Sequence, residues 1–254
     1  IIINDQEFTD ITGNLESSGG KVNRLRGSAR QGGGLFGIDM LIDFTDALLQ
    51  GNVEVKGGNM KSLLLLAGQD YDIAGDLDGS IIVNKEGKGT GISVGGQIRN
   101  CSIRGISYPS AVFDVFIHKD ILNIHKVRID EVNGGFLAAQ VTIDFRNRNL
   151  ALDAFCSEAD ASVLNAFIKA PIDFGGKMSF AAQVGGTIEN PAANASLSVS
   201  QGQIADTPFD TLYGMFTLRD DLYNIEQLYV QKDIYKVSAY GAVPQDLFRA
   251  KGDR

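Results

Sequence analysis

The sequence predicts an all-β fold: a mostly antiparallel β-sheet built from tandem repeats of about 100 residues, with short helices. Three observations predict it. A block of sequence recurs at a fixed spacing, apolar residues alternate with polar ones, and pairs of such runs flank short polar turns.

Two stretches of the chain share one pattern of apolar residues. The first, GGLFGIDMLIDF, begins at Gly33, and the second, GGFLAAQVTIDF, begins at Gly134, which is 101 residues later. A second correspondence has the same offset, because the apolar positions of residues 115–129 recur in residues 216–230. Two matches at one offset predict a tandem array of β units.

The repeated blocks alternate with a period of two. Every second residue is apolar from Phe36 to Phe44 and again from Leu137 to Phe145, and a weaker third copy runs from Tyr235 to Val243. Such a period predicts strands with one apolar and one solvated side. Hairpins are expected where Ile117 and Leu122, and likewise Leu218 and Tyr223, flank polar turns, so neighbouring strands should be antiparallel.

Two short segments read as helices, residues 59–67 and 160–170. The second begins at a capping candidate, Asp160, and places Val163, Leu164, Phe167 and Ile168 on one face. Each segment precedes a glycine-containing strand, expected at 71–83 and 172–184.

We therefore divide the chain into the tail of one β-groove repeat (1–45), a full repeat (46–146) and a second full repeat with a C-terminal linker (147–254, the linker being 245–254).

Composition excludes several classes of function. The 254 residues are 44% hydrophobic and 21% charged, with a formal net charge of −8. That charge opposes binding to nucleic acid and to anionic membrane surfaces. No apolar run is long enough to span a membrane.

The chain begins within the apolar run Ile1 to Ile3, so we expect an internal segment of a longer protein. Cys101 and Cys156 are expected to be free, packed thiols, although a disulfide is conceivable.

Motifs that carry chemistry are weak. Residues 91–95 match the G-x-S-x-G elbow of hydrolases, but a strand rather than a helix is expected after Ser93. His118 and His125 have Arg219 and Glu226 as repeat counterparts, which suits neither a metal ligand nor a general base. The glycine-rich stretch 87–96 lacks the helix that a phosphate loop needs. The acidic residues of 70–78 lack calcium-loop spacing. No catalytic residue, metal or cofactor is expected, and the protein is not expected to be an enzyme.

The apolar faces leave two architectures open. In a β-sandwich they would be buried against a second sheet, whereas a single curled sheet would leave an apolar trough. The periodicity does not choose between them.

The last ninety or so residues resemble a repeat of the TamB family, part of the AsmA-like superfamily. The resemblance is carried by VGGTIENP at 184–191, the strand 197–204 with Gly202, FDTLYG at 209–214 and YGAVP at 240–244. The middle repeat lacks the Asn-Pro and Phe-Asp-x-Leu elements and has Tyr108, Pro109 and Ser110 near there. The resemblance implies an inner-membrane-anchored, bridge-like lipid transfer protein (a translocation and assembly module component) in the periplasm. It also implies a partner at the outer membrane, an assembly protein of the Omp85 type.

The resemblance implies an elongated sheet that is curled into a groove (a β-groove, or β-taco). It further implies a segment of a periplasm-spanning bridge that conducts phospholipid between inner and outer membranes and supports outer-membrane biogenesis. Phospholipid acyl chains are the expected partners, and the anchor would lie outside this fragment. A binding module that assists assembly of outer-membrane β-barrel proteins is the alternative, and a hydrolase built on Ser93 is the third hypothesis. The predicted groove lining is Phe36, Ile38, Met40, Ile42, Phe44, Val115, Ile117, Leu122, Ile124, Leu137, Ala139, Val141, Ile143, Phe145, Phe216, Leu218, Tyr223 and Ile225.

Overall fold

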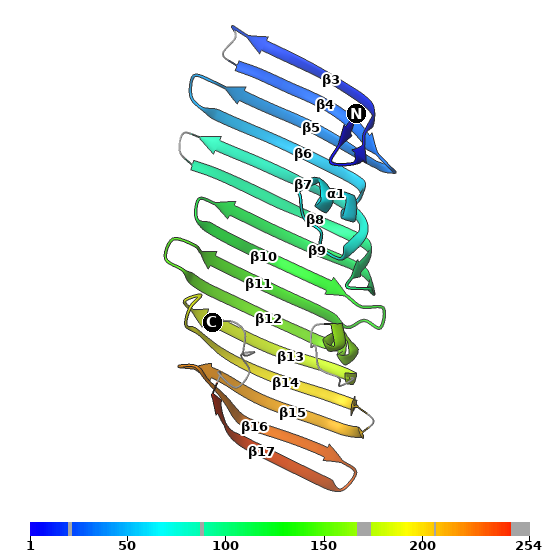
Figure 1. Cartoon of the computed structure of the whole chain (residues 1–254), viewed down its shortest axis with the longest axis vertical. Helices are drawn as coiled ribbons and strands as arrows, with labels where there is room; N and C mark the ends of the chain where they lie inside the picture. Colours follow the sequence, from blue (N-terminus) through cyan, green and yellow to red (C-terminus); the bar gives the residue numbers. More distant parts are fainter. Residues whose placement is uncertain (20–21, 87–88, 167–173, 206, 245–254) are drawn as a thin grey trace. The chain divides into compact units, whose positions relative to one another are not determined.

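The structure is a computed structural model that describes all residues except 20–21, 87–88, 167–173, 206 and 245–254. It divides into two compact units, residues 1–130 (unit 1) and 131–254 (unit 2). The strands of unit 1 are β1 (Ile2–Ile3), β2 (Gln6–Glu7), β3 (Thr9–Ser18), β4 (Val22–Gln31), β5 (Gly34–Asp43), β6 (Leu48–Asn59), β7 (Ile73–Glu86), β8 (Gly89–Ile103), β9 (Ile106–His118) and β10 (Ile121–Asp130). Helix α1 (Met60–Leu66) follows β6 (Figure 1).

Unit 2 repeats this design. Its strands are β11 (Phe136–Asp144), β12 (Asn149–Asp160), β13 (Phe174–Gly186), β14 (Pro191–Ile204), β15 (Thr207–Arg219), β16 (Leu222–Lys232) and β17 (Tyr235–Pro244). A 3-10 helix, η1 (Ala161–Ala166), follows β12. In each unit the long strands pair with their chain neighbours in antiparallel order, and β3 and β17 are edge strands. The all-β, antiparallel fold class is confirmed, as are the hairpin registers Ile117 with Leu122 and Leu218 with Tyr223.

The ends of the strands define two edges in each unit. The hairpins β5–β6, β7–β8 and β9–β10 of unit 1, and β11–β12, β13–β14 and β15–β16 of unit 2, lie at one end, which we call the turn edge. Helices α1 and η1 follow strands that finish at the opposite end, the helix edge. Two equivalent turns, β5–β6 and β11–β12, are each held by one carboxylate: Asp43 accepts from the N–H of Thr45, and Asp144, 101 residues later, accepts from the N–H groups of Arg146 and Asn147.

The β-bulges near the helix edge bend the sheets locally, and four of them form two pairs that recur 101 residues apart. The register shifts between Val55 and Gly58 in β6 and between Cys156 and Ala159 in β12. It shifts again in β8 and β14, opposite Gly75 and Gly176. The bulge residues Gly57, Asn100, Glu158 and Gln201 have φ values of +63°, +49°, +54° and +50°. Because a bulge increases twist and bends its strand, these positions produce the predicted curl.

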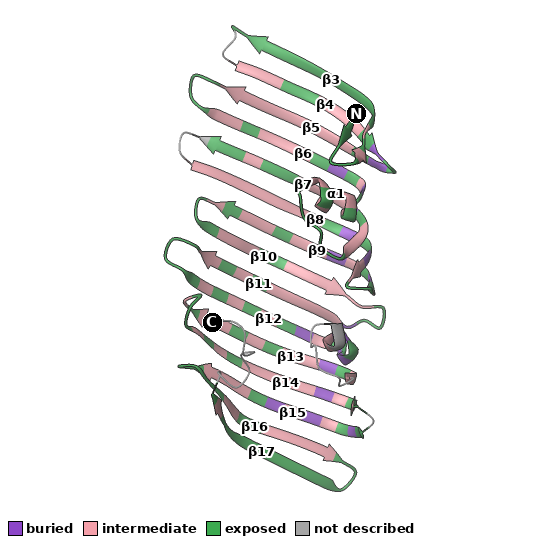
Figure 2. Cartoon of the chain, in the orientation of Figure 1, coloured by how far each residue is buried: buried purple, intermediate pink, exposed green. Residues whose placement is uncertain are grey.

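Most of the buried side chains on the sheets lie beside the bulges. The buried band, as we call these residues, is made of Val55, Leu77, Ile98 and Ala111 in unit 1 and of Cys156, Met178, Val199 and Leu212 in unit 2. Each member of the first set stands 101 residues before its counterpart in the second. Figure 2 shows the buried positions towards the helix-edge ends of β6, β8 and β9 and of β12 to β15.

The short helices cover the sheet at this edge. Asn59 caps α1 by accepting a hydrogen bond from the N–H of Ser62 at 2.9 Å, which confirms the helix predicted for 59–67. The second predicted helix is a tighter 3-10 helix over its described part: η1 begins at Ala161, Asp160 accepts from the N–H of Ser162, and Val163 is buried. Phe167 and Ile168 lie outside the described residues, as does the predicted linker 245–254. No helix in the described ranges is long and apolar enough to cross a membrane.

The division at residues 45 and 146 stays a prediction. Both boundaries fall in turns at the turn edge, β5–β6 and β11–β12. The compact units instead divide between Asp130 and Glu131. A tandem repeat can be cut at any phase of its period, so the two divisions describe the same array from different starting points.

Candidate functional site

The strand registers separate an apolar face from a polar face in each unit. In unit 1, Ile38 pairs with Val53, and the same row of cross-strand partners continues across the sheet. This row contains Ile38, Val53, Ile81, Val94, Val115 and Ile124. In unit 2, the equivalent row contains Ala139, Ala154, Ala182, Ala195, Phe216 and Ile225. Since side chains opposite one another share a face, each row forms an apolar stripe across the strands.

The predicted lining residues on strands all lie on this apolar face. In unit 1, Met40 and Ile117 belong to a second row nearer the turn edge, in which Ile92 and Leu122 also stand. In unit 2, the corresponding row contains Val141, Leu152, Val184, Ala193, Leu218 and Tyr223. Ile117 and Tyr223 are exposed and the other strand members are half-buried. Phe44 and Phe145 stand in the turns after β5 and β11, where they are 69% and 56% exposed.

Little protein covers the apolar face. In the described part of either unit, no second sheet packs over these rows, so the sandwich architecture is not what forms. At the helix edge of unit 1, the α1 side chain Leu63 comes close to Gly58, beside Phe36 and Val55. Phe8, which follows the small β1–β2 sheet, packs edge-on against Phe36 with ring centroids 5.7 Å apart. The apolar face is thus closed near the helix edge and open towards the turn edge.

A hollow forms on this face where glycines replace side chains. It lies over β3 to β6 and has a volume of about 360 Å³. Gly13 and Gly27 pair across β3 and β4, and Leu25, Phe36 and Ile38 are among the apolar side chains around them. The volume falls within the range of about 300–1,000 Å³ that is typical of ligand pockets.

Sequence reasoning missed the buried band, although the repeat held the signal. Leu77 and Met178 are 101 residues apart, as are Ile98 and Val199, and all four are buried on the apolar face. Extending the offset to every apolar residue pair would have marked these positions. They form the closed side of the candidate groove.

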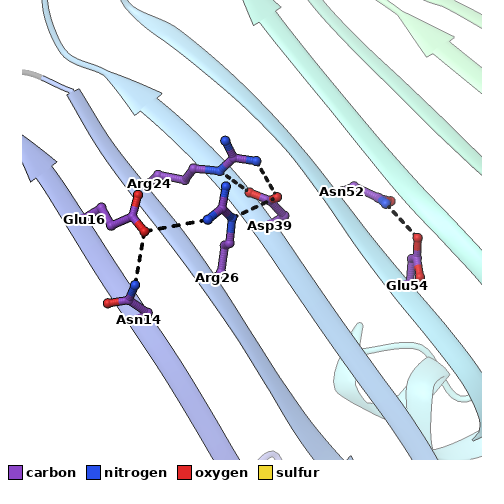
Figure 3. A network of polar contacts seen from close by, with 7 residues as sticks. All are labelled: Asn14, Glu16, Arg24, Arg26, Asp39, Asn52 and Glu54. Carbon is purple, nitrogen blue, oxygen red and sulfur yellow. Dashed lines mark hydrogen bonds and ion pairs between the residues drawn. The ribbon is translucent and has the colours of Figure 1, made fainter.

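The opposite face carries the polar side chains. Asp39 accepts two hydrogen bonds from Arg24, at 2.9 and 2.7 Å, and lies 3.4 Å from Arg26, which also approaches Glu16 at 3.6 Å (Figure 3). The hydrogen bond from Arg24 lowers the pKa of Asp39. Because these groups are about half exposed, the network keeps this face solvated and adds little to stability.

The hydrolase motif lacks the surroundings that its chemistry requires. Ser93 lies inside β8, between Ile82 and Phe116 on the polar face, and β8 continues to Ile103 without a helix. A nucleophile elbow needs a sharp turn from strand to helix at the serine.

The histidines and acidic residues form no metal centre that the structure describes. His125 lies 3.8 Å from Asp114 on the exposed polar face, and both it and His118 stack on Phe116. Among the described residues, no group of three or more histidine, cysteine or acidic side chains could hold a metal ion.

Both cysteines are free and buried, as predicted from their number and spacing. Burial raises the pKa of the Cys101 thiol, and it raises that of Cys156 to about 11. A protonated, enclosed thiol is a poor nucleophile, so neither residue suits catalysis.

Comparison of the chain with protein-family models, curated proteins and solved structures gives no match.

Proposed function

We propose that the apolar face of each unit binds the acyl chains of phospholipid. In this proposal the chain is a segment of a periplasmic bridge that conducts phospholipid between the inner and outer membranes. The single observation that carries it is the half-buried, uncovered apolar face in both units. Each acyl CH₂ that leaves water for such a surface gains up to about 0.8 kcal/mol.

The chemistry of the face suits a mobile lipid chain. Its rows contain aliphatic and aromatic side chains, and in unit 2 the central row is largely alanine. A surface with few hydrogen-bonding groups holds a chain mainly by contact area, so few positions bind it tightly. The motifs shared with TamB repeats support the same role.

Photocrosslinking tests this function with residues that are neighbours in sequence but lie on opposite faces. A photoreactive amino acid would replace Ile81 or Val141 on the apolar face, and Ser80 or Gln140 beside them on the polar face. In diderm bacteria that carry the full-length protein, the apolar-face probes should capture phospholipid several times more often than their controls. Equal capture at both faces would overturn the proposal.

A second candidate function rests on the edge strand β17. Its ten residues are exposed apart from the half-buried Val243, and in the described chain only β16 pairs with it. Such an edge could bind a strand of an outer-membrane β-barrel precursor by strand addition. Binding of a precursor that is lost with prolines in β17, but kept when Ile81 and Val141 become aspartate, would favour this candidate over lipid transfer.

A further inference from the structure

One charged side chain interrupts the apolar face of unit 1. On β7 the residues Leu77, Gly79, Ile81 and Val83 share this face, and Lys85 continues the same alternation. Lys85 pairs with Leu49 and Thr90, so it belongs to the row at the turn edge. Between the bulges and the turn edge, no other described strand residue on the apolar face of unit 1 is charged.

Lys85 is exposed and forms no ion pair with a described residue. Asp43, at the end of β5, belongs to the other face, because it pairs with Val22 and Leu48, and its carboxylate accepts from the N–H of Thr45. The corresponding position of unit 2 is Gly186, and between the bulges and the turn edge no described strand residue on the apolar face of that unit is charged. The chain has a net charge of −8, so the positive side chain of Lys85 on an otherwise uncharged surface departs from the overall acidity of the protein.

The apolar surface that leads away from Lys85 is long enough for a lipid tail. From Lys85 to the buried Leu77 the strand advances eight residues, or about 26 Å at about 3.3 Å per residue. The hydrocarbon of one bilayer leaflet is about 15 Å thick, half of a core of about 30 Å. A tail lying along β7 would therefore fit between Lys85 and the closed side near α1.

We propose that unit 1 contains a binding position for an anionic phospholipid, with the phosphate-bearing headgroup at Lys85 and the tail along the apolar face of β7. This inference rests on the proposed function and adds selectivity for headgroup charge. Charge complementarity at the open edge identifies the occupant, because a zwitterionic or neutral lipid gains less from a lone ammonium group. Unit 2, with Gly186 in this place, binds tails without regard to the headgroup.

The test uses the full chain and vesicles of two compositions, phosphatidylcholine alone or an equal mixture of phosphatidylcholine and phosphatidylglycerol. The protein is separated from the vesicles, and the retained lipid is counted by native mass spectrometry. From the mixture, the wild-type chain should retain phosphatidylglycerol over phosphatidylcholine by roughly two- to fivefold, the range for one exposed charge pair. K85Q should retain the two lipids equally, and K85R should keep the preference.

Lys56 supplies the matched control, because it is an exposed lysine on the polar face of β6. K56Q should keep the preference of the wild-type chain. The preference should also decline between about 0.1 M and about 1 M salt, because the Debye length falls from about 10 Å to about 3 Å.

The outcomes separate this inference from the proposed function. If the wild-type chain retains both lipids equally, or if K85Q keeps the preference, the Lys85 site is wrong while lipid binding stands. If the wild-type chain retains no lipid from either kind of vesicle, the proposed function itself fails.

Discussion

Units 1 and 2 share a backbone frame but differ in the side chains that line it. Bulges, short helices and buried positions recur 101 residues apart, from Gly57 and Glu158 at the first bulge to Leu77 and Met178 in the buried band. The individual side chains on the open part of the apolar face are not repeated between the units. Gly79 and Gly96 face each other in unit 1, where an added Cβ would lie 2.7 Å from a backbone oxygen. Phe180 and Leu197 occupy the equivalent places in unit 2.

This difference separates two kinds of constraint. The frame is fixed by backbone geometry and by the enclosed contacts at the helix edge, so its buried residues change between the units but stay apolar, as Leu77 and Met178 do. The open face varies more in side-chain size, because glycine stands at positions 79 and 96 of unit 1 and larger side chains stand at the equivalent places of unit 2. If the repeats served only their own stability, only the backbone geometry and the contacts at the helix edge would have to be kept. The uniformly apolar character of the open face, despite its changing residues, is what the proposed lipid contact explains.

The largest expected effect is the loss of a side chain from the buried band. Met178 is 1% exposed, so Met178→Ala should reduce the free energy of unfolding by about 2–5 kcal/mol, through lost burial and the cavity left behind. Leu77→Ala should cost a similar amount in unit 1. Denaturant unfolding followed by circular dichroism measures both.

Met215 provides the control for this substitution. It lies on the polar face of β15 and is 42% exposed, so Met215→Ala should change stability by no more than about 0.5 kcal/mol. Equal losses for Met178→Ala and Met215→Ala would show that the buried band is not the core of unit 2.

A smaller effect is expected where the two units fill one position differently. Cys101 pairs with Tyr108 in unit 1, and Gly202 pairs with Phe209 in unit 2. A Cβ at Gly202 would lie 2.2 Å from the Phe209 ring. Because that ring is buried, Gly202→Cys should cost about 1–3 kcal/mol. Thermal unfolding measures the loss.

Two further variants sharpen this comparison. Gly33→Ala places a Cβ where no atom lies within 4 Å, and it should be close to neutral. In the double variant Gly202→Cys with Phe209→Ala, the loss should be less than the sum of the two single losses, because the clash is removed. Simple additivity would mean that Gly202 and Phe209 do not constrain each other.

The sequence predicted several of the strands, two of the antiparallel hairpins and the two faces, because a period of two specifies which residues share a side. It did not predict which apolar residues are buried. Val53 and Val55 are identical residues on the same face of β6, yet only Val55 is buried, since α1 and Phe36 lie over its end of the strand. The alternation of apolar and polar residues along one strand carries no information about contacts with segments that are distant in the sequence.

The bulges were also beyond sequence reasoning. Their left-handed residues are glycine, asparagine, glutamate and glutamine, and only the first two favour that conformation. Glu158 and Gln201 therefore look like ordinary strand residues. For the candidate groove, the period of two placed the predicted lining residues on one face. It could not predict which edge of that face is open and which is closed, because this depends on where α1 and η1 pack.

The smallest expected effect is an exchange between equivalent bulge residues. Gly57 and Glu158 adopt nearly the same φ, but a side chain at that φ costs roughly 1–2 kcal/mol relative to glycine. Glu158→Gly should therefore stabilise unit 2, by about 0.5–1 kcal/mol once the greater freedom of glycine in the unfolded chain is counted. Gly57→Glu should destabilise unit 1 by a similar amount. Differential scanning calorimetry resolves both changes.

The ion pair of Glu158 needs a separate control in this exchange. Lys177 lies 3.6 Å from the Glu158 carboxylate, and both side chains are more than half exposed, so the pair contributes little. Lys177→Gln removes the pair without altering the backbone, and it should leave stability almost unchanged. If Glu158→Gly lowers stability while Lys177→Gln does not, the Glu158 side chain stabilises the bulge by other contacts. The two units would then hold the same bulge by different means.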